Sequence, residues 1–354
     1  MSKTRVAVLG ATGMIGQRFV QLLEDHPWFE IEGLYASERS DGKKLKEVIK
    51  VKDYSFMPET LGRTVEHIDT KKIAKNCRAA FSGLPSEIAK DYEQSLADAG
   101  VAVFSNAGSH RMREDVPLLI PEVNPEHLKL IEAQPSYQNG GYIVTNANCS
   151  TTGLAVPAKA LQNAFGLQQV IVSTYQAVSG AGYPGVPSLD IIGNVIPFIK
   201  GEEEKMEAEL HKMLGTLEGT RVKNASFGML ANCARVPVHD GHLESAVILP
   251  GGDCTCEEAM AAMRAFRPEP QKLELPTAPQ NPIIVREEAD RPQPLWDLNA
   301  GVPERARGMS VTVGRLRKKD KYLKMFLISH NTIRGGAGGS VLNAELAMAK
   351  GVLK

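Results

Sequence analysis

The sequence has no excess of charge of either sign. Among its 354 residues, Lys plus Arg and Asp plus Glu both number 41, so the formal net charge is zero. A chain without a net field has no global electrostatic attraction to nucleic acid or to an anionic membrane. We therefore expect neither as a partner, and any site for an anionic ligand has to be local.

Long hydrophobic runs are also missing. No stretch of about 18 apolar residues occurs, and residues 1–5 lead into a strand-like segment without the apolar core of a signal peptide. The expected location is therefore the cytoplasm. The apolar content of 43% and the charged content of 23% are ordinary for a globular protein, and the length favours two domains over one.

Cysteine is scarce and unpatterned. The five cysteines are an odd number and contain no C-x-x-C pair. Neither a disulfide framework nor a zinc ribbon is supported by such spacing, and we expect no metal site.

The first half of the chain alternates strand and helix patterns. Strands are predicted at 5–9, 31–35, 79–82, 101–105 and 142–144, with helices at 16–25 and 86–99. Strands separated by helices imply right-handed crossovers and a parallel sheet. Residues 1–148 are therefore predicted to form a Rossmann-type dinucleotide-binding domain in an α/β protein.

The second half has longer strands and fewer helices. Strands are predicted at 170–177, 231–238, 243–249, 309–316 and 322–330, with helices at 202–214 and 256–265. This pattern is typical of an α+β catalytic and dimerisation domain, here 149–335, on a largely antiparallel sheet. The Pro-rich tract 268–303 is predicted to be an extended loop or an arm on a partner subunit, and the helix within 336–354 is expected to return to the first domain.

The first predicted strand leads into a glycine-rich turn. Glycines allow a tight turn and a close approach of the backbone to a pyrophosphate, and the helix that follows directs its N–H groups at the negative charge. Strand, turn and helix in this order indicate a dinucleotide site. Its predicted cofactor contacts are Gly10, Thr12, Gly13, Met14, Ile15 and Gly16.

The end of the second predicted strand bears on which dinucleotide binds. Ser37, Arg39 and Ser40 offer hydroxyls and a guanidinium to a ribose 2′-phosphate, which favours NADP. Glu38 argues the other way, because an inward carboxylate would repel that phosphate and accept the ribose hydroxyl. NAD is therefore possible as a secondary cofactor, and a merely solvated loop is the structural alternative.

Cys149 stands just after a strand pattern and just before a helix pattern. Unpaired N–H groups and the helix dipole favour an anion at this place, and so a thiolate, which is a nucleophile. Such a nucleophile needs a proton shuttle. His242, at the beginning of a predicted strand, suits that role, but His239 is a rival on the sequence alone.

Five motifs in order resemble those of aspartate-semialdehyde dehydrogenases, with the archaeal and fungal branch the nearer. They are the glycine turn, Asn148 to Gly153, Thr174 to Gly182, Arg235 to His242, and Asn331 to Gly338. The resemblance covers essentially the whole chain. It implies an enzyme that converts aspartyl 4-phosphate and NADPH into aspartate semialdehyde, inorganic phosphate and NADP through a thioester, in the biosynthesis of lysine, threonine, methionine and isoleucine. The Pro-rich tract and the antiparallel sheet favour a homodimer or homotetramer.

The resemblance also implies roles for single residues. Cys149 would be the nucleophile, His242 the acid and base, and Gln176 the residue that orients the acyl intermediate. The implied substrate and phosphate contacts are Arg235 for the α-carboxylate, Glu209 for the amino group, Arg111 and Lys212 for phosphate, and Asn148. Further cofactor contacts are expected at Ser82, Gly83, Ser179, Gly180, Ala181 and Asn331.

Several alternatives stay open. Glu209 lies in a helix so rich in charge that a solvated face is its default interpretation, and Arg113 could replace Arg111 at the phosphate. Malonyl-CoA reductase is an alternative activity, although malonate semialdehyde has no amino group for Glu209. A non-catalytic nucleotide-sensing protein would not need Cys149 and His242 together.

Overall fold

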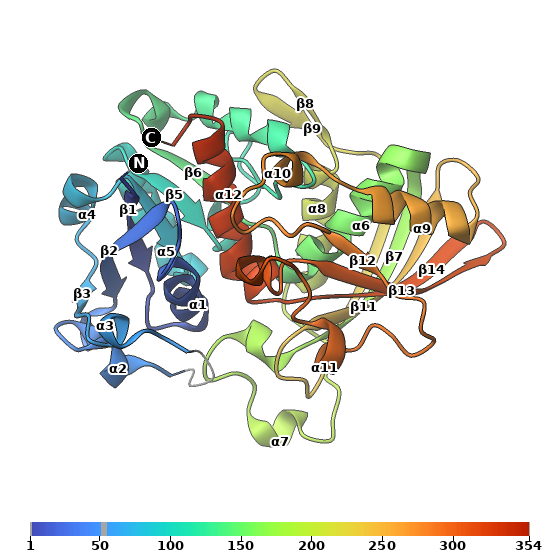
Figure 1. Cartoon of the computed structure of the whole chain (residues 1–354), viewed down its shortest axis with the longest axis horizontal. Coiled ribbons are helices and arrows are strands. Elements are labelled where there is room, and N and C mark those ends of the chain that lie inside the picture. The colour runs from blue at the N-terminus through green and yellow to red at the C-terminus, as the bar shows by residue number, and fades with distance from the viewer. Residues whose placement is uncertain (1, 51–54, 354) are drawn as a thin grey trace.

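Two six-stranded sheets lie side by side in the computed structural model, which describes residues 2–50 and 55–353 (Figure 1). The strands of the first sheet come from residues 4–145 and those of the second from residues 167–329. The two chain ends lie near each other beside the first sheet (Figure 1).

The first sheet is entirely parallel, with strand order β3-β2-β1-β4-β5-β6. Its strands are β1 (Thr4–Leu9), β2 (Phe29–Ala36), β3 (Val65–His67), β4 (Ala79–Ser82), β5 (Ala102–Ser105) and β6 (Tyr142–Thr145). The last three are buried along their whole length, which explains their continuous apolar sequence. This strand order is that of a dinucleotide-binding fold, so the predicted Rossmann-type sheet is confirmed.

Helices cover both faces of this sheet. On one face lie α1 (Met14–Leu23) and α12 (Gly338–Ala349), and on the other α4 (Thr70–Asn76) and α5 (Ser86–Asp98). The C-terminal helix α12 therefore packs beside α1 against the first sheet. Short helices complete this half: η1 (Glu38–Ser40), α2 (Leu45–Val48), α3 (Pro58–Leu61), η2 (Gly108–His110), η3 (Pro125–Ala133) and η4 (Pro135–Asn139).

The second sheet is mixed, with order β10-β7-β11-β14-β13-β12. Its strands are β7 (Leu167–Gln176), β10 (Gly228–Arg235), β11 (His242–Pro250), β12 (Ile283–Val285), β13 (Val311–Lys319) and β14 (Tyr322–Ser329). The central pairs are antiparallel, as predicted, but the edge strands β10 and β12 pair in parallel. The connection from β7 to β10 runs through α8, and the connection from β12 to β13 is a long loop, so each of these strand pairs can be parallel.

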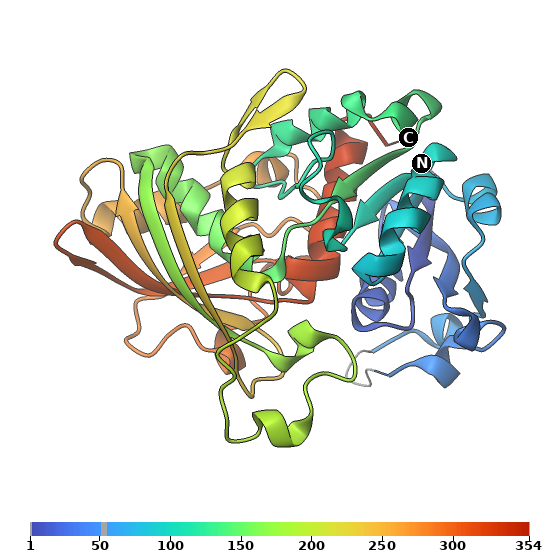
Figure 2. The ribbon, with the colours of Figure 1, turned by 180° about the vertical axis from the view of Figure 1, so that it is seen from behind.

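One face of the second sheet packs on α6 (Cys149–Phe165), α8 (Glu202–Met213) and α9 (Cys256–Ala265). Seen from behind, α8 lies in front of the second sheet, on its side toward the first (Figure 2). The smaller elements are η5 (Val178–Ala181), α7 (Ser188–Ile191), the hairpin β8 (Thr216–Glu218) and β9 (Arg221–Lys223), α10 (Glu269–Lys272), α11 (Pro294–Asp297), η6 (Glu304–Ala306) and η7 (Ile333–Ala337).

The Pro-rich tract is more ordered than its composition suggested. It contains β12 and the short helices α10 and α11, and β12 completes the sheet of its own chain beside β13. Asp297 holds the tract in place by accepting hydrogen bonds from Arg291 and Arg286. The prediction of an extended loop without structure was therefore wrong in this part, because pairing with β13 supplies order that local sequence does not signal.

Candidate active site

The glycine turn between β1 and α1 packs backbone against backbone. A Cβ at Gly16 would lie 1.9 Å from the carbonyl oxygen of Gly10, and a Cβ at Gly10 would lie 2.9 Å from that of Gly83, which follows β4. Gly10 also has φ +73°, which favours glycine. Gly13 is the N-cap of α1, and Met14 is its first residue. Side chains at Gly10 and Gly16 would collide with this backbone, so glycines are needed for the tight turn that presents the N-terminus of α1, and such a turn fits a pyrophosphate.

The other predicted cofactor residues of the first domain lie at the same edge of the sheet. The Ala11 N–H donates to the Tyr35 carbonyl (3.0 Å), which ties the glycine turn to the end of β2. Ser37 is the N-cap residue of η1, Arg39 and Ser40 lie in η1, and Ser82 ends β4. Thr12 and Ile15 belong to the turn and to the first turn of α1. These residues therefore share the carboxyl edge, where dinucleotides bind.

Cys149 is the first residue of α6, as the sequence predicted. Asn148 caps the helix, since its Oδ1 accepts hydrogen bonds from the N–H groups of Ser150 (3.0 Å) and Thr151 (3.1 Å). A Cβ at Gly335 would lie 2.7 Å from the Cα of Cys149, so only glycine permits η7 to pack here. The partly exposed thiol is thereby held at a helix N-terminus.

His242 lies beside this thiol. Its Nε2 is 3.2 Å from the Sγ of Cys149, and its Nδ1 accepts a hydrogen bond from the Ala177 N–H (3.1 Å). The ring is therefore fixed by the backbone that follows β7, and one nitrogen faces the sulfur. His239, its rival on the sequence, is exposed and pairs with Asp240.

Burial favours the neutral forms of both groups. Desolvation, followed by the charge of Glu202, raises the pKa of Cys149 to about 12, although Arg111, Arg235 and the Ser150 N–H oppose this shift. Desolvation and Arg235 lower the pKa of His242 to about 3. The expected thiolate is therefore not the favoured form of Cys149, because burial outweighs the effect of the helix N-terminus.

Two further residues border the pair. Arg235 is buried, and its Nη1 donates to the Ala177 carbonyl (2.8 Å). A Cβ at Gly180 would lie 2.7 Å from that nitrogen and 3.0 Å from Cε1 of His242, so Gly180 must lack a side chain. Gln176 pairs with Arg235 across β7 and β10 and is buried. The guanidinium, the imidazole and the thiol thus form one cluster.

Asn331 connects the segments that would flank a nicotinamide. Its Nδ2 donates to Ser179 Oγ (2.8 Å), and its Oδ1 accepts from the Gly241 N–H (2.8 Å). Ser179, Gly180 and Ala181 belong to η5, so the end of β14 and the start of β11 are joined to η5 here. The structure therefore gathers these predicted residues around His242.

Glu209 and Lys212 share the buried face of α8, as their spacing predicted, so the solvated alternative for Glu209 is wrong. Glu209 Oε1 pairs with Arg111 Nη1 (3.0 Å), and its Oε2 accepts from the Asn148 N–H (2.6 Å). Arg113 instead pairs with Asp115 in a half-exposed position. The structure thus brings Arg111, and not Arg113, to Glu209.

Lys212 is fully committed to backbone carbonyls. Its Nζ donates to the carbonyl oxygens of Arg111 (2.7 Å), Arg113 (2.7 Å) and Val116 (3.0 Å), and burial lowers its pKa to about 8. An ammonium has three hydrogens, so none is left for another ligand in this state. Lys212 therefore holds the loop that carries Arg111.

The sequence interpretation missed two buried carboxyl groups near the thiol. Glu202, the first residue of α8, accepts a hydrogen bond from Gln176 Nε2 (3.1 Å). Glu244 on β11 is fully buried, and burial raises its pKa well above the usual value. For Glu244 the alternating burial of β11 was an available signal, since its position follows His242 on the inward face.

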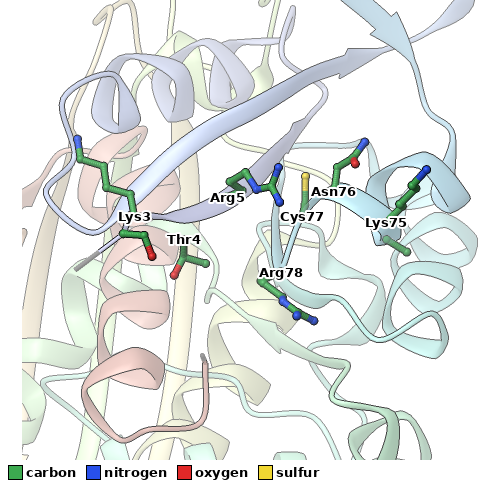
Figure 3. Close-up of a pocket in the computed structure, with 9 residues that line it drawn as sticks. Lys3, Thr4, Arg5, Lys75, Asn76, Cys77 and Arg78 are labelled. Atoms are coloured by element: carbon green, nitrogen blue, oxygen red, sulfur yellow. The ribbon is translucent and has the colours of Figure 1, made fainter.

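A separate cavity of about 360 Å³ lies at the opposite edge of the first sheet, near the start of β1. Lys3, Arg5, Lys75 and Arg78 line it, but their cationic groups point in different directions (Figure 3). This cavity is not a converging anion site and lies away from the thiol.

Comparisons with known proteins decide the family. A family model for the semialdehyde dehydrogenase NAD-binding domain matches residues 5–131, and one for the semialdehyde dehydrogenase dimerisation domain matches residues 158–334. The aspartate-semialdehyde dehydrogenase of Archaeoglobus fulgidus is 48% identical over 98% of this chain and 99% of its own length. The chain belongs to the aspartate-semialdehyde dehydrogenase family.

Other members of the aspartate-semialdehyde dehydrogenase family agree in sequence and in fold. The Aspergillus fumigatus enzyme is 43% identical over 99% of both chains. The crystal structure of the Candida albicans enzyme with NADP is 38% identical, covers 99% of both chains and has a TM-score of 0.89. The protein is therefore an oxidoreductase, and its α/β fold class is confirmed.

Residues 2–50 and 55–353 contain no group of three or more His, Cys, Asp and Glu side chains that could hold a metal ion. In the same part of the chain, no helix is both long and apolar enough to span a membrane.

Proposed function

We propose that this chain is an NADP-dependent aspartate-semialdehyde dehydrogenase that works through a thioester on Cys149. The observation that carries the proposal is the 3.2 Å approach of His242 Nε2 to the Cys149 sulfur, with Arg235 and Glu209 at the same helix start. An amino acid semialdehyde requires a nucleophile, a group that transfers protons, and partners for its carboxylate and ammonium groups, and the thiol, the imidazole, the guanidinium and the carboxylate could supply them. A non-catalytic protein would have no need to bury them together.

Charge complementarity supports the substrate. The planar guanidinium of Arg235 suits a bidentate contact with the α-carboxylate, and Glu209 suits the ammonium group. Arg111, already paired with Glu209, would meet the phosphate, with its loop held by Lys212. Asn148 would offer the substrate a hydrogen bond from its Nδ2, because its Oδ1 already caps α6. Malonyl-CoA offers Glu209 no ammonium group, so the semialdehyde is the better fit.

The chain's own residues would carry out the covalent steps. In the oxidative direction the Cys149 thiol gives up its proton as its sulfur adds to the aldehyde carbon, and the aldehyde oxygen gains a proton, which yields a hemithioacetal. Its carbon would then lose a hydride to NADP and its hydroxyl group a proton, which leaves a thioester, and a phosphate oxygen displaces the Cys149 sulfur to give the acyl phosphate. His242 holds a proton at Nε2, toward sulfur in the free site and toward the substrate oxygen once sulfur is bonded to carbon. The Ser150 N–H at the helix start lowers the cost of negative charge on the sulfur.

NADP fits the carboxyl edge of the first sheet. The cradle of Gly10, Gly13 and Gly16 would hold the pyrophosphate, and Ser37 with Arg39 would meet a 2′-phosphate. When bound, the cofactor exchanges a hydride with the carbon bonded to Cys149, and the positive charge of its oxidised ring favours the thiolate. The exposed Glu38 keeps NAD a possible secondary cofactor.

The decisive experiment is a spectrophotometric assay of NADP reduction with aspartate semialdehyde and phosphate, compared with NADPH oxidation by malonyl-CoA. We expect turnover only with the semialdehyde, and Cys149→Ala should abolish it while NADPH still binds with wild-type affinity. Turnover only with malonyl-CoA would replace the proposed substrate. Wild-type rates in the variant would refute the thioester.

The domain bounds, the oligomeric state and the cellular role are also proposals. We retain residues 1–148 with the helix in 336–354 as the cofactor domain, and residues 149–335 as the catalytic and dimerisation domain. On the outer face of the second sheet, Tyr175 and Leu230 are exposed on β7 and β10. Exposed apolar groups on a sheet face support a homodimer or homotetramer. A cytoplasmic role in the biosynthesis of lysine, threonine, methionine and isoleucine completes the proposal.

A further inference from the structure

Glu202 is buried, although the first turn of a helix is a place where glutamates are usually exposed to solvent. Three glutamates, Glu202, Glu203 and Glu204, form the first turn of α8, where a negative charge is favourable. Glu204 is exposed, as such residues usually are, whereas Glu202 points inward and is only 6% exposed. A buried carboxylate needs hydrogen-bond donors to offset its desolvation, so the contacts of Glu202 are informative.

The donor that Glu202 meets is Gln176. The Nε2 of Gln176 donates to Glu202 Oε1 (3.1 Å) and to Thr174 Oγ1 (3.2 Å). Thr174 and Gln176 lie on the same inward face of β7 and are each 1% exposed. A primary amide has two hydrogens, so both are occupied. Only the carbonyl oxygen Oε1 of Gln176 remains for another partner.

We infer that Glu202 is a positioning residue, which holds the amide of Gln176 so that its oxygen, and not its nitrogen, faces the group bonded to Cys149. This inference rests on the proposed function. An amide oxygen accepts hydrogen bonds, so Gln176 would recognise a donor on the substrate, either the hydroxyl of the hemithioacetal or the ammonium group. It would not donate to an oxyanion, and that task falls to His242, whose Nε2 faces the Cys149 sulfur.

The charge of Glu202 acts on the same site. Desolvation is the largest cause of the raised pKa of Cys149, and the charge of Glu202 adds to it, while Arg111 and Arg235 oppose the shift. After desolvation, the charge of Glu202 also raises the pKa of Glu244 on β11. Glu202 therefore has two separable effects, a hydrogen bond to Gln176 and a charge near the thiol.

A second thiol, which is buried, lies near the same charge. Glu202 contributes to the raised pKa of Cys233 on β10, whose thiol also contacts Met206 on α8. Cys233 is buried, whereas Cys149 is partly exposed, so an alkylating reagent reaches Cys149 and not Cys233 in the folded protein. Measurements on Cys149 can therefore report the charge of Glu202.

Three variants separate the two effects. Glu202→Gln removes the charge but keeps an acceptor oxygen at the same reach. Glu202→Asp keeps the charge but withdraws the oxygens by one methylene, and Glu202→Ala removes both. Glu204→Gln, in the same helical turn but exposed, is the matched control. Melting temperatures and NADPH binding establish that each variant is folded.

Kinetics test the hydrogen bond. We expect Glu202→Asp and Glu202→Ala to lower kcat about tenfold or more, the loss of one oriented hydrogen bond, with a smaller change in KM for NADP. Glu202→Gln should stay within about threefold of the wild type. A wild-type kcat in Glu202→Asp would overturn the inference, and so would a Glu202→Gln variant that loses as much as Glu202→Asp.

The pH dependence of Cys149 alkylation tests the charge. Iodoacetamide labelling, followed by mass spectrometry of the peptide that contains Cys149, should show a lower apparent pKa in Glu202→Gln and an unchanged one in Glu202→Asp and Glu204→Gln. An unchanged value in Glu202→Gln would contradict the placement of Glu202. If the wild type itself fails to oxidise aspartate semialdehyde, the proposed function falls, and this titration still tests the placement of the Glu202 charge near the thiol.

Discussion

Replacing Arg111 by methionine should destabilise the protein and abolish turnover by two separate routes. The guanidinium and Glu209 form a buried ion pair (3.0 Å), and removing one partner of such a pair typically costs about 3–5 kcal/mol. Glu209 would still accept the Asn148 N–H (2.6 Å), so we expect a value near the lower end, about 3 kcal/mol. With an unfolding entropy of about 2.1 cal/mol/K per residue over 354 residues, this corresponds to a fall in Tm of about 4 °C.

A double variant separates stability from activity. In Arg111→Met with Glu209→Gln, no buried charge is left unpaired, and the new amide oxygen can still accept the Asn148 N–H. We expect about half of the lost Tm to return while turnover remains absent, because the contacts to phosphate and ammonium are both gone.

The assays are calorimetric melting and NADP reduction with aspartate semialdehyde. Arg113→Met is the control, since its pair with Asp115 is half-exposed and worth at most about 1 kcal/mol. A wild-type Tm for Arg111→Met, or a double variant whose Tm falls by the sum of both single effects, would refute the reasoning.

The remaining predictions concern His242, Gly16 and Glu93. His242→Gln should slow turnover by about 100-fold or more, whereas His239→Gln should leave it unchanged; equal effects in a rate assay would end the assignment. Gly16→Ala places a Cβ 1.9 Å from the Gly10 carbonyl oxygen, so NADPH affinity measured by fluorescence should fall at least tenfold. Burial raises the pKa of Glu93 to about 7, so its stabilising contribution is lost as pH rises from about 4.5 through 7, by about 3 kcal/mol; Glu93→Gln should flatten this dependence of Tm.

Elements with strong local patterns were predictable. The strand at β4 and the helix α9 agree with their predicted bounds, because apolar residues with turn signals, or with helical spacing and a cap, specify them locally. The strands β3 and β12 were missed. Each has three residues and is a strand only because a neighbour pairs with it, and such pairing has no local signature.

The candidate site divides in the same way. The position of Cys149 at a helix start followed from its neighbours in the chain, and the preference for His242 over His239 came from a resemblance. The pairing of Arg111 with Glu209 joins residues 98 positions apart. The protonation states also depend on the fold, since burial reverses what the helix N-terminus alone would favour for the thiol.

The sequence by itself determined the alternation that yields a parallel sheet, the glycine turn, and a cysteine at the start of a helix, because each depends on residues within a few positions of one another. Only the tertiary structure decided that the Lys212 ammonium group donates to backbone carbonyl oxygens and that Glu202 accepts a hydrogen bond from Gln176. Those choices depend on which buried donors and acceptors meet across elements, and a buried polar group is bound to whatever partner the packing places beside it.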